Sequence, residues 1–223
     1  MLRRLFKYRL LRWLLYVLLA PYVLALAYII VPPPSTLMLY DLATFTMPKR
    51  TWVALEEISP NLIKAVLVAE DSAYCDHFGF DFRAIEKSLD KAADGKRFGG
   101  ASTITQQTAK NLFLWHDRSW LRKALEAPLA LWLELVMSKG RILEIYLNVA
   151  EWAPGVYGAQ AAAQHHFKTT AKNLNLAQAS LLAASLPNPE RRVAGRPSAG
   201  VALKAASITR RALMQAPEVA CLK

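Results

Sequence analysis

Nineteen consecutive residues near the amino terminus, from Trp13 to Val31, carry no charge and are almost all apolar. As a helix they would span roughly 28 Å, which is close to the hydrocarbon thickness of a bilayer. The aromatic side chains Trp13, Tyr16 and Tyr28 fall near the two ends of the run, where amphipathic rings favour the membrane interface. The run therefore predicts a transmembrane helix over residues 13–31, which confines the rest of the chain to folding at a membrane.

The segment before this run, residues 1–12, contains five basic side chains and no acid. Such a basic head stays in the cytoplasm, so the rest of the chain is expected outside. A cleaved signal peptide is the alternative, but its apolar core would be shorter and a small-residue cleavage site should follow it. Here VPPPST follows instead, which opens a stiff linker over residues 32–44. We therefore predict a single-pass inner-membrane protein whose main domain, residues 45–195, faces the periplasm.

The net charge narrows the possible partners, and the cysteines narrow the possible disulfides and metal sites. The formal net charge is +11, and +6 remains outside the basic head, which suits a phosphate-bearing partner or a membrane surface. No DNA- or RNA-binding motif is present, so nucleic acid is not an expected partner. Cys75 and Cys221 are the only cysteines and stand at no metal-ligand spacing, so neither a disulfide framework nor a zinc site is expected.

Helical periodicity dominates the chain after residue 60, and no strand pattern of any strength appears there. Caps and breakers predict helices that begin after Ser59 and Ser119, and further helices over residues 81–94, 141–148, 159–167 and 176–186. The fold class is therefore predicted to be mainly all-α, with residues 196–223 as a C-terminal helical extension.

The first of these helices ends on a carboxylate. Ile63, Val66, Leu67 and Glu70 fall at i, i+3, i+4 and i+7, so Glu70 prolongs an apolar stripe. A carboxylate that is partly removed from water accepts a proton more readily, as a general base near neutral pH must. The alternative is that Glu70 turns outward into solvent at a frayed helix end.

A polar stretch follows a Gly99–Gly100 turn. It supplies neutral hydrogen-bonding groups and one cation, at Ser102, Thr103, Thr105, Gln106, Gln107, Lys110 and Asn111. This composition resembles the lining of a sugar or phosphate site. Taken alone, the stretch is equally consistent with a polar capping loop that leads into a helix.

A second carboxylate, Glu126, also heads an apolar stripe, with Arg122 four residues before it. A buried carboxylate beside a fixed cation stays ionised, and two carboxylates in different environments are typical of acid–base chemistry on sugars. The simpler alternative is a helical i, i+4 ion pair worth a few tenths of a kcal/mol. Pro128 removes one hydrogen bond from this helix and should kink it.

Together these segments resemble the peptidoglycan glycosyltransferase family, whose domain also stands at the front of class A penicillin-binding proteins. Its four motifs occur in order as EDSAYCDHFGFD (Glu70 to Asp81), GGASTITQQTAKNL (Gly99 to Leu112), RKALE (Arg122 to Glu126) and KGRILEIYLN (Lys139 to Asn148). The resemblance covers residues 45–195. Because no transpeptidase domain is expected after it, the monofunctional biosynthetic branch of the family is the expected match.

The resemblance implies a lysozyme-like helical fold with two lobes, the second of which dips into the membrane. It implies that Glu70 is the general base, which takes the proton from the sugar 4-hydroxyl of lipid II. That oxygen would attack C1 of the growing glycan chain, and undecaprenyl diphosphate would leave with inversion to a β-1,4 bond. Glu126 would support the donor side or the leaving diphosphate, and a divalent cation, magnesium or manganese, is left open there.

Lys110 and Arg122 match basic residues of the family that meet the diphosphate, a task that suits charge-assisted hydrogen bonds. The remaining substrate positions implied by the resemblance are Ser102, Thr103, Gln106, Gln107, Asn111 and Lys123. Lipid II, the lipid-linked glycan and the bilayer are the implied partners, with cell-division or elongation proteins as further candidates. Asp71, Asp76, His77 and Asp81 are expected to shape the turn after Glu70.

The chain departs from the family pattern at three places. Tyr74 stands where Phe is usual and adds a hydroxyl that needs a partner, Gln178 replaces a common acid, and Ala153 a common Gly. These changes affect packing and leave the two glutamates and Lys110 in place. Two rival functions stay open: a peptidoglycan-cleaving lytic transglycosylase of related fold, and a non-enzymatic membrane adaptor.

Overall fold

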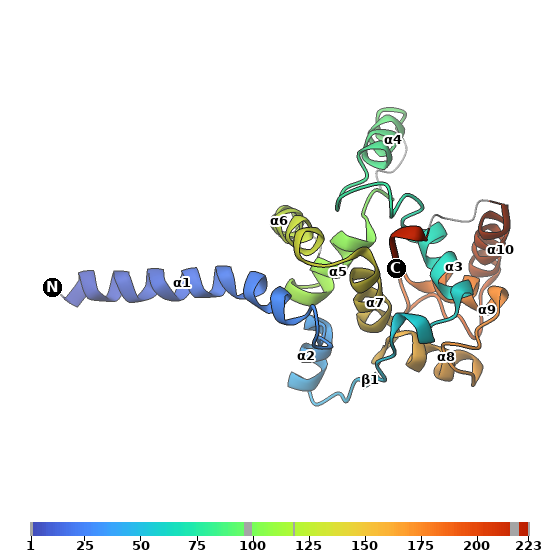
Figure 1. The fold of residues 1–223 in the computed structure, drawn as a ribbon, viewed down its shortest axis with the longest axis horizontal. Coiled ribbons are helices and arrows are strands. Elements are labelled where there is room, and N and C mark those ends of the chain that lie inside the picture. The colour runs from blue at the N-terminus through green and yellow to red at the C-terminus, as the bar shows by residue number, and fades with distance from the viewer. Residues whose placement is uncertain (1, 96–99, 118, 215–218, 223) are drawn as a thin grey trace.

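The computed structural model describes residues 2–95, 100–117, 119–214 and 219–222, so Gly99 of the predicted glycine turn lies outside the described residues. The chain is mainly helical, as predicted (Figure 1). Its helices are α1 (Leu2–Ala27), α2 (Thr36–Ala43), α3 (Pro60–Glu70), α4 (Phe82–Ala93), α5 (Ile104–Phe113), α6 (Trp120–Val136), α7 (Lys139–Val149), α8 (Ala159–Phe167), α9 (Leu176–Ser185) and α10 (Ala199–Met214). Short 3₁₀ turns are η1 (Leu55–Glu57) and η2 (Ala220–Leu222), and the strands are β1 (Lys49–Arg50), β2 (Glu151–Ala153) and β3 (Val156–Tyr157).

Helix α1 extends away from the rest of the molecule and meets it only near its C-terminal end (Figure 1). There the Trp132 indole Nε1 of α6 donates to the Tyr22 carbonyl at 3.0 Å, and the two rings lie 5.8 Å apart. Searching the described residues for a helix long and apolar enough to cross a membrane identifies none.

Helix α2 occupies most of the segment that the sequence indicated as linker. Ser35 caps it, because its hydroxyl accepts a hydrogen bond from the Met38 amide at 3.1 Å. The Thr36 hydroxyl donates to the Leu114 carbonyl at 2.6 Å, which ties α2 to the end of α5. The sequence indicated only a linker here, because eight residues carry too little periodicity for a helix to be recognised without this tertiary support.

The three strands form one small sheet in the order β1-β3-β2, with β1 parallel and β2 antiparallel to β3. The expectation of no strand after residue 60 therefore fails for residues 151–157. Strands of two and three residues show no readable alternation, and long-range pairing with residues 49–50 completes this sheet.

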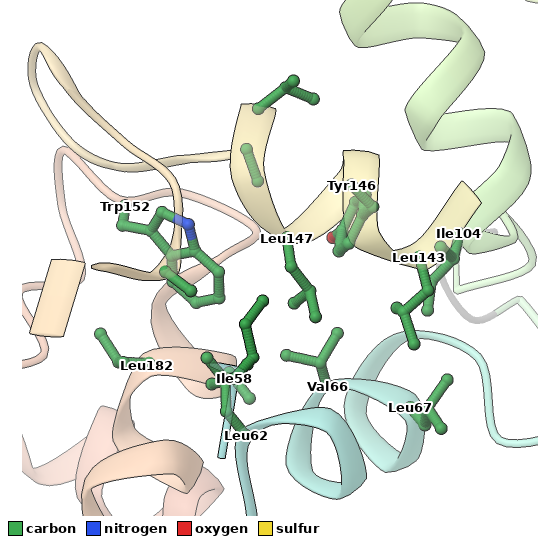
Figure 2. Close-up of a cluster of buried hydrophobic side chains, with 14 of the residues drawn as sticks. Ile58, Leu62, Val66, Leu67, Ile104, Leu143, Tyr146, Leu147, Trp152 and Leu182 are labelled. Carbon is green, nitrogen blue, oxygen red and sulfur yellow. The ribbon is translucent and has the colours of Figure 1, made fainter. Parts of the chain in front are cut away.

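The core lies where α3, α7 and α9 meet (Figure 2). Leu143 and Leu147 of α7 face Val66 and Leu67 of α3, and all four side chains are buried. Helix α3 begins at the predicted cap, since the Asn61 amide donates to the Ser59 hydroxyl at 3.2 Å. Because α3 packs against the core along its length, its last residue, Glu70, has a fixed position at the edge of the core.

Cys75 and Cys221 form a disulfide, with their Cα atoms 5.7 Å apart. No disulfide was expected from the sequence, and this bond corrects that expectation. They are 146 residues apart in sequence, and their meeting depends on η2 folding back onto the start of α7. That approach is close: a Cβ on Gly140 would lie 2.5 Å from the Leu222 carbonyl oxygen.

Candidate active site

Glu70 is the last residue of α3 and is half-buried, as its place on the apolar stripe predicted. The Gln107 amide Nε2 donates to Glu70 Oε2 at 3.0 Å. The Tyr146 hydroxyl donates in turn to Gln107 Oε1 at 3.1 Å. Gln107 is therefore held at both ends of its amide, and this chain from α7 through α5 fixes one oxygen of the Glu70 carboxylate.

A cavity of about 180 Å³ opens beside Glu70. Its wall includes Ser102 and Thr103 from the polar stretch, and Arg211 from α10. The Arg211 guanidinium donates to the Val68 carbonyl at 2.9 Å, two residues before the end of α3. The carboxylate thus faces a small polar space whose described lining includes hydroxyl groups, the Arg211 cation and the carboxylates of Asp71 and Asp81.

A second cavity of about 180 Å³ contains Lys110, one turn after Gln107 on α5. Gln107, Asn111, His116 and Tyr146 also line it. Burial and the nearby Arg122 charge lower the pKa of Lys110, an effect that Glu70 partly opposes. Among the described residues no ion pair is formed by this lysine, so its charge is available to an anion that enters the cavity.

Glu126 is 3% exposed and sits between two cations of its own helix. Arg122 forms the predicted i, i+4 ion pair with it, and Lys123 Nζ lies 2.7 Å from Oε2. Lys123 also donates to the Ser102 hydroxyl at 3.2 Å, which connects α6 to the wall of the Glu70 cavity. The third motif is thereby joined to the first two.

Of the remaining predicted site residues, some line a cavity and others support the start of helix α5. Asn111 is buried against the Lys110 cavity. Thr103 and Gln106 form a capping box at the start of α5, and the Thr103 hydroxyl also donates to the Gly79 carbonyl at 2.7 Å. Gln106 is 5% exposed and its side-chain oxygen accepts from the Thr103 amide, so its contact in the structure is with the helix cap.

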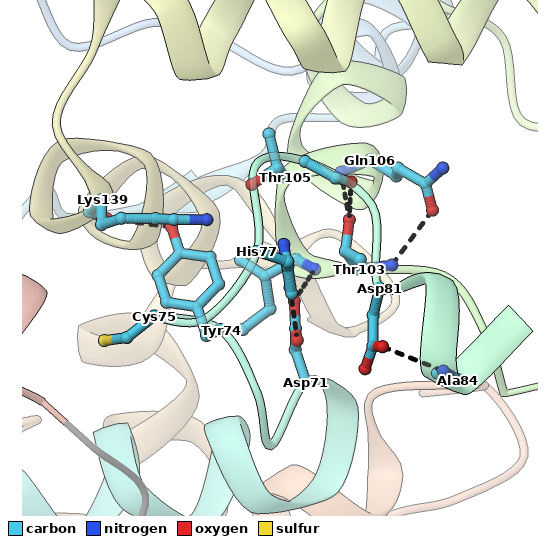
Figure 3. Close-up of polar contacts among 12 residues, drawn as sticks. Asp71, Tyr74, Cys75, His77, Asp81, Ala84, Thr103, Thr105, Gln106 and Lys139 are labelled. Atoms are coloured by element: carbon cyan, nitrogen blue, oxygen red, sulfur yellow. Dashed lines mark hydrogen bonds and ion pairs between the residues drawn. The ribbon is translucent and has the colours of Figure 1, made fainter.

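The turn after Glu70 is shaped by its polar residues, as predicted (Figure 3). Asp71 Oδ2 accepts from the Ile104 amide at 2.9 Å, and Oδ1 lies 2.9 Å from His77 Nε2. Asp81 caps α4 by accepting from the Ala84 amide at 2.9 Å. The buried Tyr74 hydroxyl finds its required partner in the Lys139 carbonyl at 2.9 Å.

Sequence reasoning missed several residues that build the site. Tyr146 orients Gln107 and lies within the fourth motif, which was the available signal. Glu134 is buried and accepts from the Thr105 hydroxyl at 2.6 Å and from Lys139 at 2.7 Å, which locks α5, α6 and α7 together. Arg211 reaches the Glu70 cavity from α10, outside the four motifs, and no local pattern indicated it.

Comparisons with known proteins identify the family of the chain. A family model described as transglycosylase matches residues 39–214. This chain belongs to the transglycosylase family. It is 50% identical over 216 residues to the biosynthetic peptidoglycan transglycosylase of Agrobacterium fabrum, with 96% of each chain covered. It is also 47% identical over 215 residues to the protein of the same name from Brucella suis, again with 96% of each chain covered.

A third relative, the biosynthetic peptidoglycan transglycosylase of Jannaschia, is 54% identical over 183 residues, which cover 82% of this chain and 75% of the relative. The matched region of the family model includes α10 as well as the four motifs. It therefore includes the lining of the Glu70 cavity, with Arg211, and the lining of the Lys110 cavity except Ser35 and Leu37.

Proposed function

We propose that this protein polymerises the glycan strands of peptidoglycan from lipid II. The observation that carries the proposal is the position of Glu70. Its carboxylate is oriented by Gln107 and faces one polar cavity, while Gln107 also lines the adjoining cavity that contains Lys110, which forms no ion pair with the residues that the structure describes. The Gln107 side chain thus lies between a base, Glu70, and a cation that can bind an anion, Lys110. Glycosyl transfer from a diphosphate donor needs both groups, one for the attacking hydroxyl and one for the leaving diphosphate.

In this mechanism the Glu70 carboxylate takes the proton from the 4-hydroxyl of the acceptor sugar. The oxygen attacks C1 of the lipid-linked chain, and the bond from C1 to the diphosphate oxygen breaks. The new bond is β-1,4, the anomeric centre inverts, and undecaprenyl diphosphate leaves with the electron pair. General base assistance of this kind contributes roughly 10²–10⁴-fold to the rate.

Lys110 supplies charge for the departing diphosphate. A half-buried lysine that forms no ion pair with a described carboxylate interacts more strongly with an entering anion than an exposed lysine does, because less water screens its charge. Such a cation is most useful at the transition state, when negative charge builds on the leaving oxygen. Glu126 acts indirectly, because its ion pairs hold Arg122 and Lys123 near the region that would receive the diphosphate.

A divalent cation at the diphosphate would need acidic ligands. Glu126 is engaged by two cations already, and no group of three or more candidate ligand side chains occurs within the described part of the chain. We therefore propose no metal centre built from protein side chains alone.

The proposal includes a place in the cell and a finer fold. We place the amino terminus in the cytoplasm, residues 13–31 in the inner membrane and a two-lobed, lysozyme-like catalytic domain in the periplasm. The charge-free run and the basic head support this arrangement. The Cys75–Cys221 disulfide supports it too, because disulfides persist in oxidising compartments such as the bacterial periplasm.

The decisive experiment compares the wild type with Glu70→Gln on labelled lipid II. The variant keeps the shape and the Gln107 neighbour but cannot take a proton, so we expect polymerisation to fall by at least about 10²-fold. Glu56→Gln is the matched control, because Glu56 is an exposed carboxylate outside both cavities and should retain full activity. Undiminished polymer in Glu70→Gln would remove the proposal.

Pre-formed glycan, incubated in parallel, separates the rivals. Shortening of that glycan would indicate a lytic enzyme, and normal cell-wall growth in cells that carry only Glu70→Gln would indicate an adaptor. The placement in the cell is tested by adding protease to spheroplasts: the domain should be digested, and protection of it would contradict a periplasmic location.

A further inference from the structure

A cationic pocket of about 440 Å³ lies between strand β1 and helix α8 and shares no lining residue with either cavity of the active site. Three basic side chains line it: Lys49 and Arg50 from β1, and Lys168 directly after α8. No carboxylate occurs among its described lining residues. Side-chain amide and imidazole groups complete the polar part of the lining, at Gln160, Gln164 and His165.

The three cations have no acidic partner. Within the described part of the chain, Lys49, Arg50 and Lys168 form no ion pair. Lys168 by itself would need no ligand, since the dipole of a helix stabilises a cation at its C-terminal end. Lys49 and Arg50 come from a different element, which the pairing of β1 with β3 brings to α8. Because like charges repel, three cations around one pocket favour an anionic ligand.

Arg50 connects the pocket to the end of the apolar run. Its guanidinium donates to the Pro33 carbonyl, two residues after Val31, where the run ends. In Figure 1, β1 lies between α2, at the base of α1, and α8. In the proposed cellular arrangement, the pocket therefore lies next to the place where the chain leaves the bilayer.

Arg141 of α7 fixes this exit to the rest of the domain. Its Nε donates to the Tyr28 carbonyl at 3.0 Å, and its Nη2 donates to the Val31 carbonyl at 3.1 Å. The guanidinium groups of Arg50 and Arg141 lie 5.4 Å and 5.2 Å from the centroid of the Trp52 ring. The end of the apolar run and strand β1 are thus held by common contacts, so the structure sets the distance of the pocket from the bilayer surface.

We propose that this pocket binds the phosphate of an anionic phospholipid headgroup, such as that of phosphatidylglycerol. Basic side chains near a membrane surface attract anionic lipids, each by a factor of about five in affinity. Gln160 Oε1 accepts from the Ala171 amide at 2.8 Å, so its Nε2 group is the part that can donate to a headgroup oxygen. A zwitterionic headgroup would bring its own positive charge against the three cations and should bind more weakly.

A bound headgroup would give the domain a second point of attachment to the membrane. A single helix in a bilayer can turn about its own axis, so it does not decide which face of the attached domain lies towards the lipid. A contact on the side of β1 and α8 restricts that rotation and holds the active site at a constant height above the bilayer. This inference rests on the proposed placement of residues 13–31 in the membrane and is independent of the polymerisation chemistry.

The test compares dihexanoyl phosphatidylglycerol with dihexanoyl phosphatidylcholine, which has the same tails and a zwitterionic headgroup. Binding to the full-length protein in one non-ionic detergent is measured by isothermal titration calorimetry. For wild type we expect phosphatidylglycerol to bind at least about tenfold more tightly than phosphatidylcholine. The Lys49→Ala/Lys168→Ala variant should bind phosphatidylglycerol about 25-fold more weakly than wild type and should bind phosphatidylcholine unchanged.

Lys87→Ala/Lys91→Ala is the matched control, because it removes the same charge from exposed positions on α4, which lies on the opposite side of the molecule from β1 (Figure 1). It should keep the preference for phosphatidylglycerol, and so should Lys49→Arg/Lys168→Arg, which retains the charge. Circular dichroism of each variant checks the fold.

Equal affinity of wild type for the two lipids would overturn the proposal, and so would an equal loss in the α4 variant. Glycerol phosphate carries the same anion without tails. If it bound as tightly as phosphatidylglycerol, the pocket would be a site for a soluble anion and the lipid would be excluded.

These outcomes are distinct from failure of the proposed function. Lys49 and Lys168 line neither active-site cavity, so their variant should polymerise lipid II in detergent as wild type does. Failure of the chemistry appears as undiminished polymerisation by Glu70→Gln, and failure of the cellular placement appears as protection of the domain in spheroplasts. Failure of the pocket alone appears as no lipid preference in wild type while both of those tests succeed.

Discussion

Breaking the Cys75–Cys221 disulfide should lower stability by a large and calculable amount. The bond joins the turn after Glu70 to the C-terminal segment and spans 146 residues of sequence. For a closed loop of that length the chain-entropy relation gives about 5 kcal/mol, as an upper bound, since engineered bonds often contribute less. Typical domains are stable by only about 5–15 kcal/mol, so this single bond would be a major part of the total.

The assay is reversible unfolding of the full-length protein in detergent, by denaturant and by heat, with and without reductant. A loss of about 5 kcal/mol corresponds to a fall of roughly 10–20 °C in Tm for a chain of this size. Cys75→Ser and Cys221→Ser should each reproduce the effect of reductant, because each removes the same bond. The double variant should be insensitive to reductant.

Equal unfolding midpoints for the oxidised and reduced protein would refute the reasoning. So would a reductant effect of the same size in the double variant, because the effect could then not come from this bond. A difference between the two single variants would show that one cysteine has a second role at its site, for example in the turn that carries Asp71 and His77.

Two further predictions follow from the site. Because burial and Arg122 lower the pKa of Lys110, its charge is lost at lower pH than that of an ordinary lysine. The alkaline limb of kcat/KM should therefore move to higher pH in Lys110→Arg, and an unmoved limb in a pH–rate profile would exclude this lysine as its cause. Asp71→Ala leaves the Ile104 amide without its carboxylate acceptor and should cost about 1.5–3 kcal/mol in urea unfolding. Asp71→Asn keeps an acceptor and should cost less; equal losses would contradict a hydrogen-bonding role.

Local features of the site were readable from the sequence. Ser59 and Ser119 cap the helices that they were predicted to cap, and α3 ends on Glu70. Arg122 and Glu126 form the expected pair within one helix. All of these depend on groups within four residues of each other, so the backbone geometry of a single helix is enough to place them.

That the motifs meet in one site depends on contacts between residues far apart in the sequence. Nothing in the spacing indicated that Tyr146 would hold Gln107, or that Lys123 would join Arg122 on Glu126 while reaching Ser102. These contacts require α5, α6 and α7 to pack at particular angles. Those angles are set by buried side chains far apart in the sequence.

The sequence by itself determined the helices, their caps and the identity of the carboxylates and cations, because these follow from periodicity and hydrogen bonding over one or two turns. Only the tertiary structure decided that α2 forms against α5, that residues 49–50 pair with residues 156–157, and that Cys221 reaches Cys75. Each of these joins segments separated by tens of residues or more. Their free energy comes from packing that exists only once the whole core has assembled.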